Sequence, residues 1–155
     1  MKPTTDHERF MRRCLDLAAM ARDQGNTPVG IVVVVDGTII GEGAETLPTG
    51  PSLTGHAEII ACQAALDATG RRDLRGAVLY TTAEPCFMCA YAIRHLRVGL
   101  VVYGTETPVV GGVTSVHPIL SDPALESWRP APAVFGGVVR EECELECRCS
   151  LISTD

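Results

Sequence analysis

Apolar and polar residues follow two different periods along this 155-residue chain, and together they predict a mixture of helices and strands. Between Phe10 and Ala21 the apolar residues recur at helical spacing, which predicts a first helix that ends near Gly25. Thr5 and Glu8 stand at the start of this segment with the spacing of a capping box. We expect this helix to serve in packing rather than in chemistry.

Continuous apolar runs predict the strands. Gly30–Val35 is apolar throughout, and the hairpin signal Asp36-Gly37 follows it and leads into a second strand. A strand without alternation is buried on both faces, so helices should cover both sides of the sheet. Two later strands, residues 77–81 and 98–103, flank a helix, and this succession predicts a right-handed parallel crossover. The apolar runs therefore predict an α/β fold of three layers, α/β/α, with a mixed central sheet that contains these four strands.

Four more helices are expected beyond the hairpin. Thr54 is a candidate cap for one that stops at Gly70, and another should run from about residue 86 to 96. Polar residues 44–55 between the hairpin and Thr54 predict a loop. Further along the chain the signals weaken, and we expect only loops around a short helix near residues 123–128, followed by a terminal helix in the tail.

Composition narrows the picture to one domain that spans residues 1–155. A net charge of −6 and a pI near 5.2 argue against a surface that neutralises many phosphates, so nucleic acid is an unlikely partner. No apolar run approaches the roughly 18 residues of a membrane span, and the first residues do not form a signal peptide. We expect a cytoplasmic protein without membrane contact, in which the seven cysteines are reduced thiols or metal ligands.

Two short segments carry the candidate chemistry: T-G-H-A-E-I, which begins at Thr54, and T-A-E-P-C-F-M-C, which ends at Cys89. His56, Cys86 and Cys89 are three good ligands for one zinc ion and leave its fourth position open for water, as in catalytic sites. Glu58 is the remaining acid, and it can carry the proton of that water. Either segment alone also fits a redox pair or a structural zinc site, whereas the two together favour catalysis.

These motifs, H-x-E and P-C-x-x-C, resemble the signature of zinc deaminases of the cytidine deaminase superfamily. T-P-V-G at residues 27–30, G-x-G at 41–43 and G-V-V-x-E-E-C at 137–143 extend the similarity over about residues 9–143. The chain is most similar to the branch of guanine deaminases, fungal cytosine deaminase and bacterial tRNA adenosine deaminases. The resemblance implies a three-layer α/β/α cytidine-deaminase-like fold with a mixed five-stranded central sheet. It also implies one Zn²⁺ per chain, a small aminated base or nucleoside and water as reactants, and a homodimer.

The resemblance also implies which residues contact the substrate. Val29 would lie beneath the substrate ring, with His56 and Cys86 beside it, and Glu45 stands where relatives have an asparagine that contacts the base. An ionised glutamate only accepts hydrogen bonds, whereas asparagine also donates them. Glu45 should therefore favour rings that present N–H groups, such as isocytosine-like, isoguanine-like, amino-triazine or mutagenic purine rings, over cytosine.

Several alternatives remain open at this stage. The chain could instead be a tRNA adenosine deaminase, a guanine or cytosine deaminase, or a zinc-bearing module without catalysis. Glu45 could face solvent, and the C-x3-C-x-C tail of Cys143, Cys147 and Cys149 could bind a second metal. His117 is a candidate ligand, although a hydrogen-bonded loop histidine is the more common case. The helix face for a dimer could comprise Ala90, Ala92, Ile93 and Leu96.

Overall fold

The structure is a computed structural model that describes residues 2–46 and 54–149. Within these residues, helices and strands succeed one another largely as the apolar patterns predict. The helices are α1 (Thr5–Asp23), α2 (Ala57–Thr69), α3 (Phe87–His95) and α4 (Arg140–Cys149), with the 3-10 helix η1 (Pro123–Leu125), and the strands are β1 (Gly30–Val35), β2 (Thr38–Ala44), β3 (Val78–Ala83), β4 (Leu100–Thr105) and β5 (Ala133–Gly136).

The strands form one five-stranded sheet in the order β2-β1-β3-β4-β5. β1 pairs antiparallel with both β2 and β3, whereas β3 and β4, and β4 and β5, are parallel pairs. α3 joins β3 to β4 and so forms the predicted parallel crossover. The mixed sheet is confirmed, and its order brings the end of β3 beside the start of β1.

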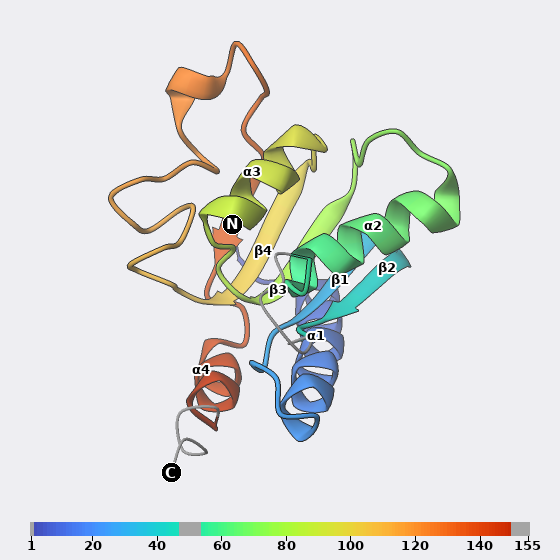
Figure 1. Cartoon of the computed structure of the whole chain (residues 1–155), viewed down its shortest axis with the longest axis vertical. Helices are drawn as coiled ribbons and strands as arrows, with labels where there is room; N and C mark the ends of the chain where they lie inside the picture. The colour runs from blue at the N-terminus through green and yellow to red at the C-terminus, as the bar shows by residue number, and fades with distance from the viewer. Residues whose placement is uncertain (1, 47–53, 150–155) are drawn as a thin grey trace.

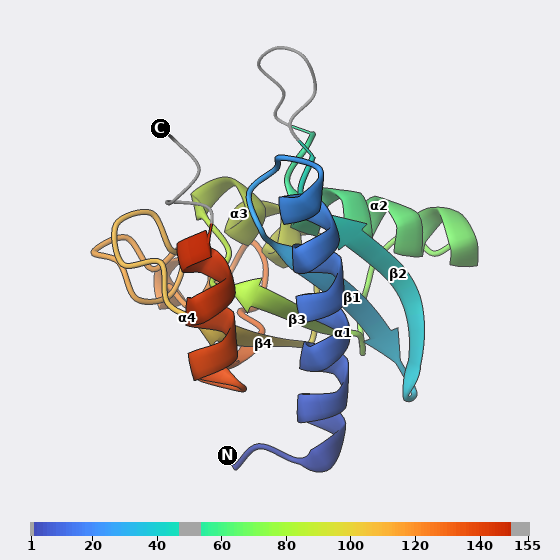
Figure 2. The same cartoon turned by 90° about the horizontal axis from the view of Figure 1, so that it is seen from below.

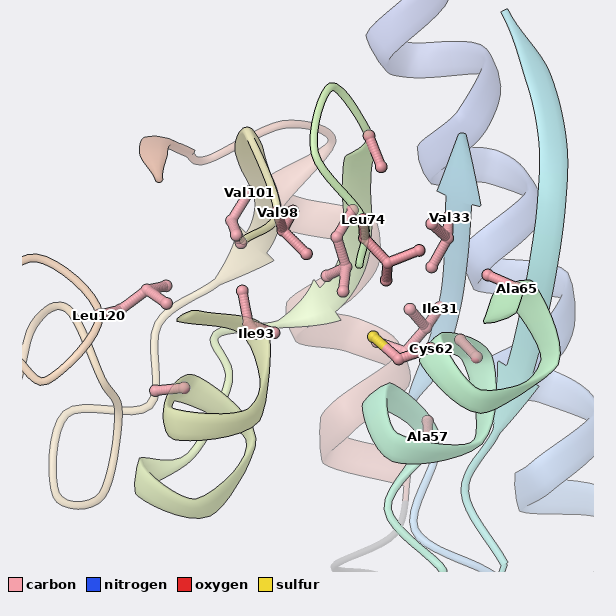
Figure 3. Close-up of a cluster of buried hydrophobic side chains, with 14 residues drawn as sticks. Ile31, Val33, Ala57, Cys62, Ala65, Leu74, Ile93, Val98, Val101 and Leu120 are labelled. Carbon is pink, nitrogen blue, oxygen red and sulfur yellow. The ribbon is translucent and has the colours of Figure 1, made fainter. Parts of the chain in front are cut away.

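Helices cover both faces of this sheet, with α1 and α4 on one side and α2 and α3 on the other (Figures 1 and 2). Alternate residues of β1 face opposite layers: Ile31 and Val33 pack with α2 and α3, and Val32 and Val34 pack with α1 and α4. Figure 3 shows Ile31 and Val33 in the first of these clusters, beside Cys62 of α2. The three-layer α/β/α prediction and the burial of β1 on both faces are therefore confirmed.

The starts of two helices differ from the prediction. Thr4, not Thr5, is the N-cap of α1, because its side chain accepts a hydrogen bond from the backbone N–H of His7 at 3.2 Å. α2 begins at Ala57 with His56 at the N-cap, so Thr54 lies outside the helix. The apolar pattern of a helix is the same whichever of two neighbouring residues is its N-cap. The hydrogen bonds to the backbone N–H groups of the first turn determine which residue it is.

The chain after β4 contains one strand that the apolar pattern does not locate. β5 has only four residues, is partly exposed and pairs with β4 alone at the edge of the sheet. η1 lies inside the short helix expected near residues 123–128, and α4 confirms the terminal helix. The loop expected over residues 44–55 falls mostly on residues 47–53, which lie outside the described residues.

Two glycines of β2 allow α2 to pack directly against the strand. A Cβ atom on Gly41 would lie 2.4 Å from the carbonyl oxygen of Ala61, and one on Gly43 would lie 2.2 Å from that of Ala57. Real Cβ atoms do not approach backbone so closely, so only glycine permits this contact. The G-x-G motif thus sets the distance between β2 and the helix that carries Glu58.

We expect Gly43→Ala to lower the free energy of unfolding by about 1–3 kcal/mol, because the added methyl group overpacks the contact between β2 and α2. Gly99→Ala is the matched control, since its Cβ would come no closer than 3.4 Å to any atom, and it should change the free energy by less than about 0.5 kcal/mol. Urea unfolding of the zinc-loaded protein measures both. Equal stability of the two variants would contradict the packing described here.

Candidate active site

The N-termini of α2 and α3 bring the predicted metal ligands together beside the end of β3. His56 is the N-cap of α2, Cys86 is the N-cap of α3, and Cys89 lies in the first turn of α3. Neither N-cap side chain is used to cap its own helix, so both are available to a ligand. The positive ends of the two helix dipoles stabilise negative charge at this position, which favours thiolates.

The three ligand atoms have the separation that a tetrahedral zinc ion requires. Nδ1 of His56 lies 3.7 Å from Sγ of Cys86 and 3.5 Å from Sγ of Cys89. With Zn–S of about 2.3 Å and Zn–N of about 2.1 Å, tetrahedral angles place a sulfur and a nitrogen about 3.6 Å apart. All three atoms lie within 4.8 Å of one another. The set therefore fits one zinc ion and supplies three of its four ligands.

The two cysteines shift each other's pKa in opposite directions because a hydrogen bond joins them. A hydrogen bond from Cys89 lowers the pKa of Cys86 to about 5, against the opposing effect of burial. The same hydrogen bond, together with burial, raises the pKa of Cys89. The hydrogen bond between the two residues thus favours the thiolate form of Cys86, and zinc binding requires both residues as thiolates.

Glu58 is a buried carboxyl group next to the ligands. It lies in the first turn of α2 with 5% of its surface exposed, and its Oε2 accepts a hydrogen bond from Sγ of Cys89 at 3.4 Å. Burial raises the pKa of Glu58 to about 7, and the nearby charge of Cys86 adds to this effect. A carboxyl group with a pKa near 7 can both take and give a proton at working pH.

Glu45 points into the same site. Its Oε2 accepts a hydrogen bond from the backbone N–H of Ala57 at 2.8 Å, so Glu45 supplies the cap of α2 that its own N-cap residue does not. The possible ligand atoms of Glu45, His56 and Glu58 lie within 4.8 Å of one another. Burial raises the pKa of Glu45 above its usual range. Glu45 is thus half-buried against the start of α2, and its contact with a substrate ring stays a prediction.

Val29 is placed beside Glu45 by the backbone. The N–H of Glu45 donates to the carbonyl oxygen of Val29 at 3.0 Å, and the half-buried Val29 side chain packs against the cluster that includes α2 and α3. A role of Val29 beneath a substrate ring stays a prediction.

The lesser candidates are placed elsewhere. His117 is exposed and contacts the edge of Phe87 at 6.0 Å between ring centroids. Cys143 is buried in the core, and no potential metal-ligand group among the residues that the structure describes includes His117 or a tail cysteine. Ala90 and Ile93 are fully buried in the core, so the face proposed for a dimer is wrong for these two residues.

Two buried charged residues, one near each end of α3, were not predicted. Glu84 directly follows β3, two residues before Cys86. It accepts four hydrogen bonds from the chain after β4. Arg94 near the end of α3 is fully buried and donates to the backbone carbonyls of Ile119, Leu120 and Arg129. The only sequence signal for either residue is a charge within an otherwise apolar segment. The hydrogen-bond partners of both residues are 23 or more positions away along the chain.

Comparison with known proteins gives a consistent result. Residues 4–105 match the cytidine and deoxycytidylate deaminase zinc-binding region. The tRNA-specific adenosine deaminase of Agrobacterium fabrum is 36% identical over 133 residues, which cover 86% of each chain. A structure from a study of A-to-I editing by tRNA:A34 deaminases has a TM-score of 0.82 at 35% identity and covers 89% of this chain and 98% of that one. Guanine deaminase from Bacillus subtilis has a TM-score of 0.60 at 39% identity over 64% of each chain.

Two further findings concern the environment of the chain. Among the described residues, no helix has the length and apolar character that crossing a membrane requires. None of the six cysteines that the structure describes forms a disulfide; they are Cys14, Cys62, Cys86, Cys89, Cys143 and Cys147.

Proposed function

Because the chain belongs to the cytidine and deoxycytidylate deaminase zinc-binding family, we propose that His56, Cys86 and Cys89 hold its zinc ion and that Glu58 moves the protons of a hydrolytic deamination. The observation that carries this proposal is the position of Glu58, which contacts Cys89 but is not needed to complete the ligand set. The substrate is a nucleobase ring that bears an exocyclic amine, and the products are the ring carbonyl and ammonia.

Glu58 has three tasks in this reaction. When bound, zinc lowers the pKa of a coordinated water toward neutrality. Glu58 accepts the proton that this water loses, gives it to the ring nitrogen next to the attacked carbon, and then helps to protonate the amine that leaves as ammonia. Its buried position keeps bulk water away from the proton, and a pKa near 7 suits both directions of transfer.

Adenosine in a tRNA is the substrate that the relatives support best. Two of the proteins compared above are described as acting on tRNA adenosine, and they align with most of this chain. The net charge of −6 led us to expect no nucleic-acid partner, and the relatives count against that expectation. Net charge describes the whole surface, whereas RNA contact requires only a local group of cations.

A small non-standard base is the second candidate, and Glu45 favours it. One carboxylate oxygen of Glu45 accepts from the N–H of Ala57, and the other, which has no hydrogen-bond donor among the described residues, could accept from a ring that presents a donor. Adenine offers only acceptors apart from its amine, whereas an isocytosine-like ring offers N–H groups. An acceptor on the ring that faces a buried carboxylate would lose its hydrogen bond, and such losses discriminate strongly between substrates.

A substrate panel with Glu45→Asn separates the two candidates. Wild-type and variant proteins are given an adenosine-containing anticodon stem-loop, guanine, cytosine, isocytosine, isoguanine and an amino-triazine, and ammonia release is measured. If Glu45 selects the ring, the variant should shift the kcat/KM ratio of cytosine to isocytosine upward by about 10- to 100-fold. An unchanged ratio would remove Glu45 from substrate selection.

The same panel tests the broader proposal. Inosine formed in the stem-loop, without turnover of the free bases, supports the tRNA candidate. Turnover of the free bases alone supports the second candidate. Zinc-loaded protein that releases no ammonia from any substrate would favour a zinc-bearing module without catalysis.

A further inference from the structure

Glu84 is a buried carboxylate that the deamination scheme does not use. It lies two residues before Cys86 and has 3% of its surface exposed. Its Oε1 accepts from the backbone N–H groups of Val113 and Thr114, both at 2.7 Å. Its Oε2 accepts from the backbone N–H of Thr107 at 2.9 Å and from the hydroxyl of Thr114 at 2.5 Å.

The partners of Glu84 are the two ends of one segment, residues 107–114, which we call the clamped loop. All four partner groups are hydrogen-bond donors, and a carboxylate, which only accepts, is satisfied by such partners. Within the described residues Glu84 forms no ion pair, so these hydrogen bonds alone compensate its burial. One side chain therefore holds the loop closed at both ends.

The clamped loop is hydrogen-bonded in turn to the segment that carries Cys86. Cys86 forms an isolated antiparallel bridge with Gly111. The N–H of Phe87 donates to the carbonyl of Val110 at 3.0 Å, and the N–H of Gly112 donates to the carbonyl of Pro85 at 2.8 Å. The clamped loop thus holds the residue before Cys86, the residue after it and Cys86 itself.

The packing around Gly111 shows how closely these parts fit. A Cβ atom at Gly111 would lie 2.2 Å from Oε1 of Glu84 and 2.5 Å from the carbonyl oxygen of Thr107. The loop therefore passes directly over the carboxylate at Gly111, where any side chain would collide with it. A displacement of the carboxylate would be transmitted through Gly111 to Cys86.

We propose that Glu84 is a positioning residue for the metal centre, which fixes Cys86 at the N-terminus of α3 by holding the clamped loop against it. Glu84 acts through Cys86 and contacts neither the substrate nor the metal. The inference rests on the zinc ligands of the proposed function, but not on the identity of the base.

Glu84→Gln in the full-length chain tests this role. Glutamine replaces one acceptor oxygen by an NH2 group that faces donors, so one end of the clamped loop is released. We expect the zinc dissociation constant, measured by competition with a chromophoric chelator, to rise about 10- to 100-fold. The thiolate-to-metal absorption of the Co²⁺-substituted protein should change, and hydrogen exchange should accelerate at residues 107, 113 and 114. With zinc in excess, kcat should fall while KM changes little.

Glu106→Gln is the matched control, because Glu106 is close in sequence but is exposed and pairs with Arg140 on the surface. It should leave zinc affinity and the Co²⁺ spectrum unchanged. Thr114→Val removes only the hydroxyl donor to Glu84 and should weaken zinc binding in the same direction but less, whereas Thr114→Ser keeps the hydroxyl and should restore affinity.

Two results would overturn the proposal. One is a folded Glu84→Gln protein with wild-type zinc affinity and an unchanged Co²⁺ spectrum. If Glu84→Gln does not fold, equal zinc affinity of Thr114→Val and Thr114→Ser decides against it. Failure of the deaminase proposal is distinguishable, because it would appear as absent ammonia release in the wild-type protein while these metal-binding effects persist.

Discussion

Replacement of Glu58 by glutamine should reduce turnover by about 10²- to 10⁴-fold while zinc stays bound. The amide has nearly the same shape as the carboxyl group but cannot accept the proton that the attacking water must lose. Glu58 is buried beside Cys89, so bulk solvent cannot easily replace it as the proton carrier. The measurement is ammonia release from the best substrate of the panel, together with zinc content per chain.

Glu42→Gln is the control for this experiment. Glu42 is a half-buried glutamate away from the metal ligands. Its carboxylate pairs with Arg13 of α1 at 2.8 Å. Its replacement should leave turnover within about threefold, since surface pairs of this kind contribute only about 0–1 kcal/mol to stability. A Glu58→Gln protein with normal turnover would refute the assigned role, and one that loses zinc would make Glu58 a ligand.

Removal of zinc should lower the melting temperature by about 8–16 °C. A ligand held at 1,000 times its dissociation constant stabilises the folded state by about 4 kcal/mol, and roughly 1 kcal/mol shifts Tm by about 2–4 °C in a chain of this size. Without the ion, His56 and two sulfur atoms remain crowded together within 4.8 Å. Calorimetry before and after treatment with a chelator, and after zinc is restored, measures the shift.

Two cysteine variants make this measurement specific. Cys89→Ala should melt at the same temperature with and without added zinc, because one of three ligands is missing. Cys147→Ala should keep the full zinc-dependent shift and one zinc ion per chain, since Cys147 on α4 belongs to no ligand group among the described residues. A zinc-dependent shift in Cys89→Ala, or a second zinc ion lost in Cys147→Ala, would contradict the three-ligand site.

The metal ligands and the layers of the fold could be predicted because their signals are local. His56 and Glu58 are two residues apart at a helix start, and Cys86 and Cys89 share one helical turn, so each pair is positioned by its own helix. The unbroken apolar run of β1 likewise determines its burial on both faces. Such features depend on neighbouring residues in the sequence, so they can be predicted without knowledge of the fold.

The features that could not be predicted depend on contacts between distant segments. Glu45 caps a helix 12 positions away, and Glu84 binds a loop 23 to 30 positions away, and nothing in the intervening residues indicates either pairing. β5 is a strand because β4 offers it a free edge, not because of its own apolar pattern. These are tertiary effects that override or add to local preference.

The two buried charges at opposite ends of α3 have a consequence for how this protein can diversify. Glu84 holds the segment after β4 near the start of α3, and Arg94 holds the same segment near the end of the helix through three backbone carbonyls. Val109, inside the clamped loop, and Val116, after it, nevertheless have side chains that are more than 80% exposed. Side-chain substitutions at these two positions can therefore accumulate over evolutionary time without disturbing the anchors, while the metal-bearing helix keeps its place.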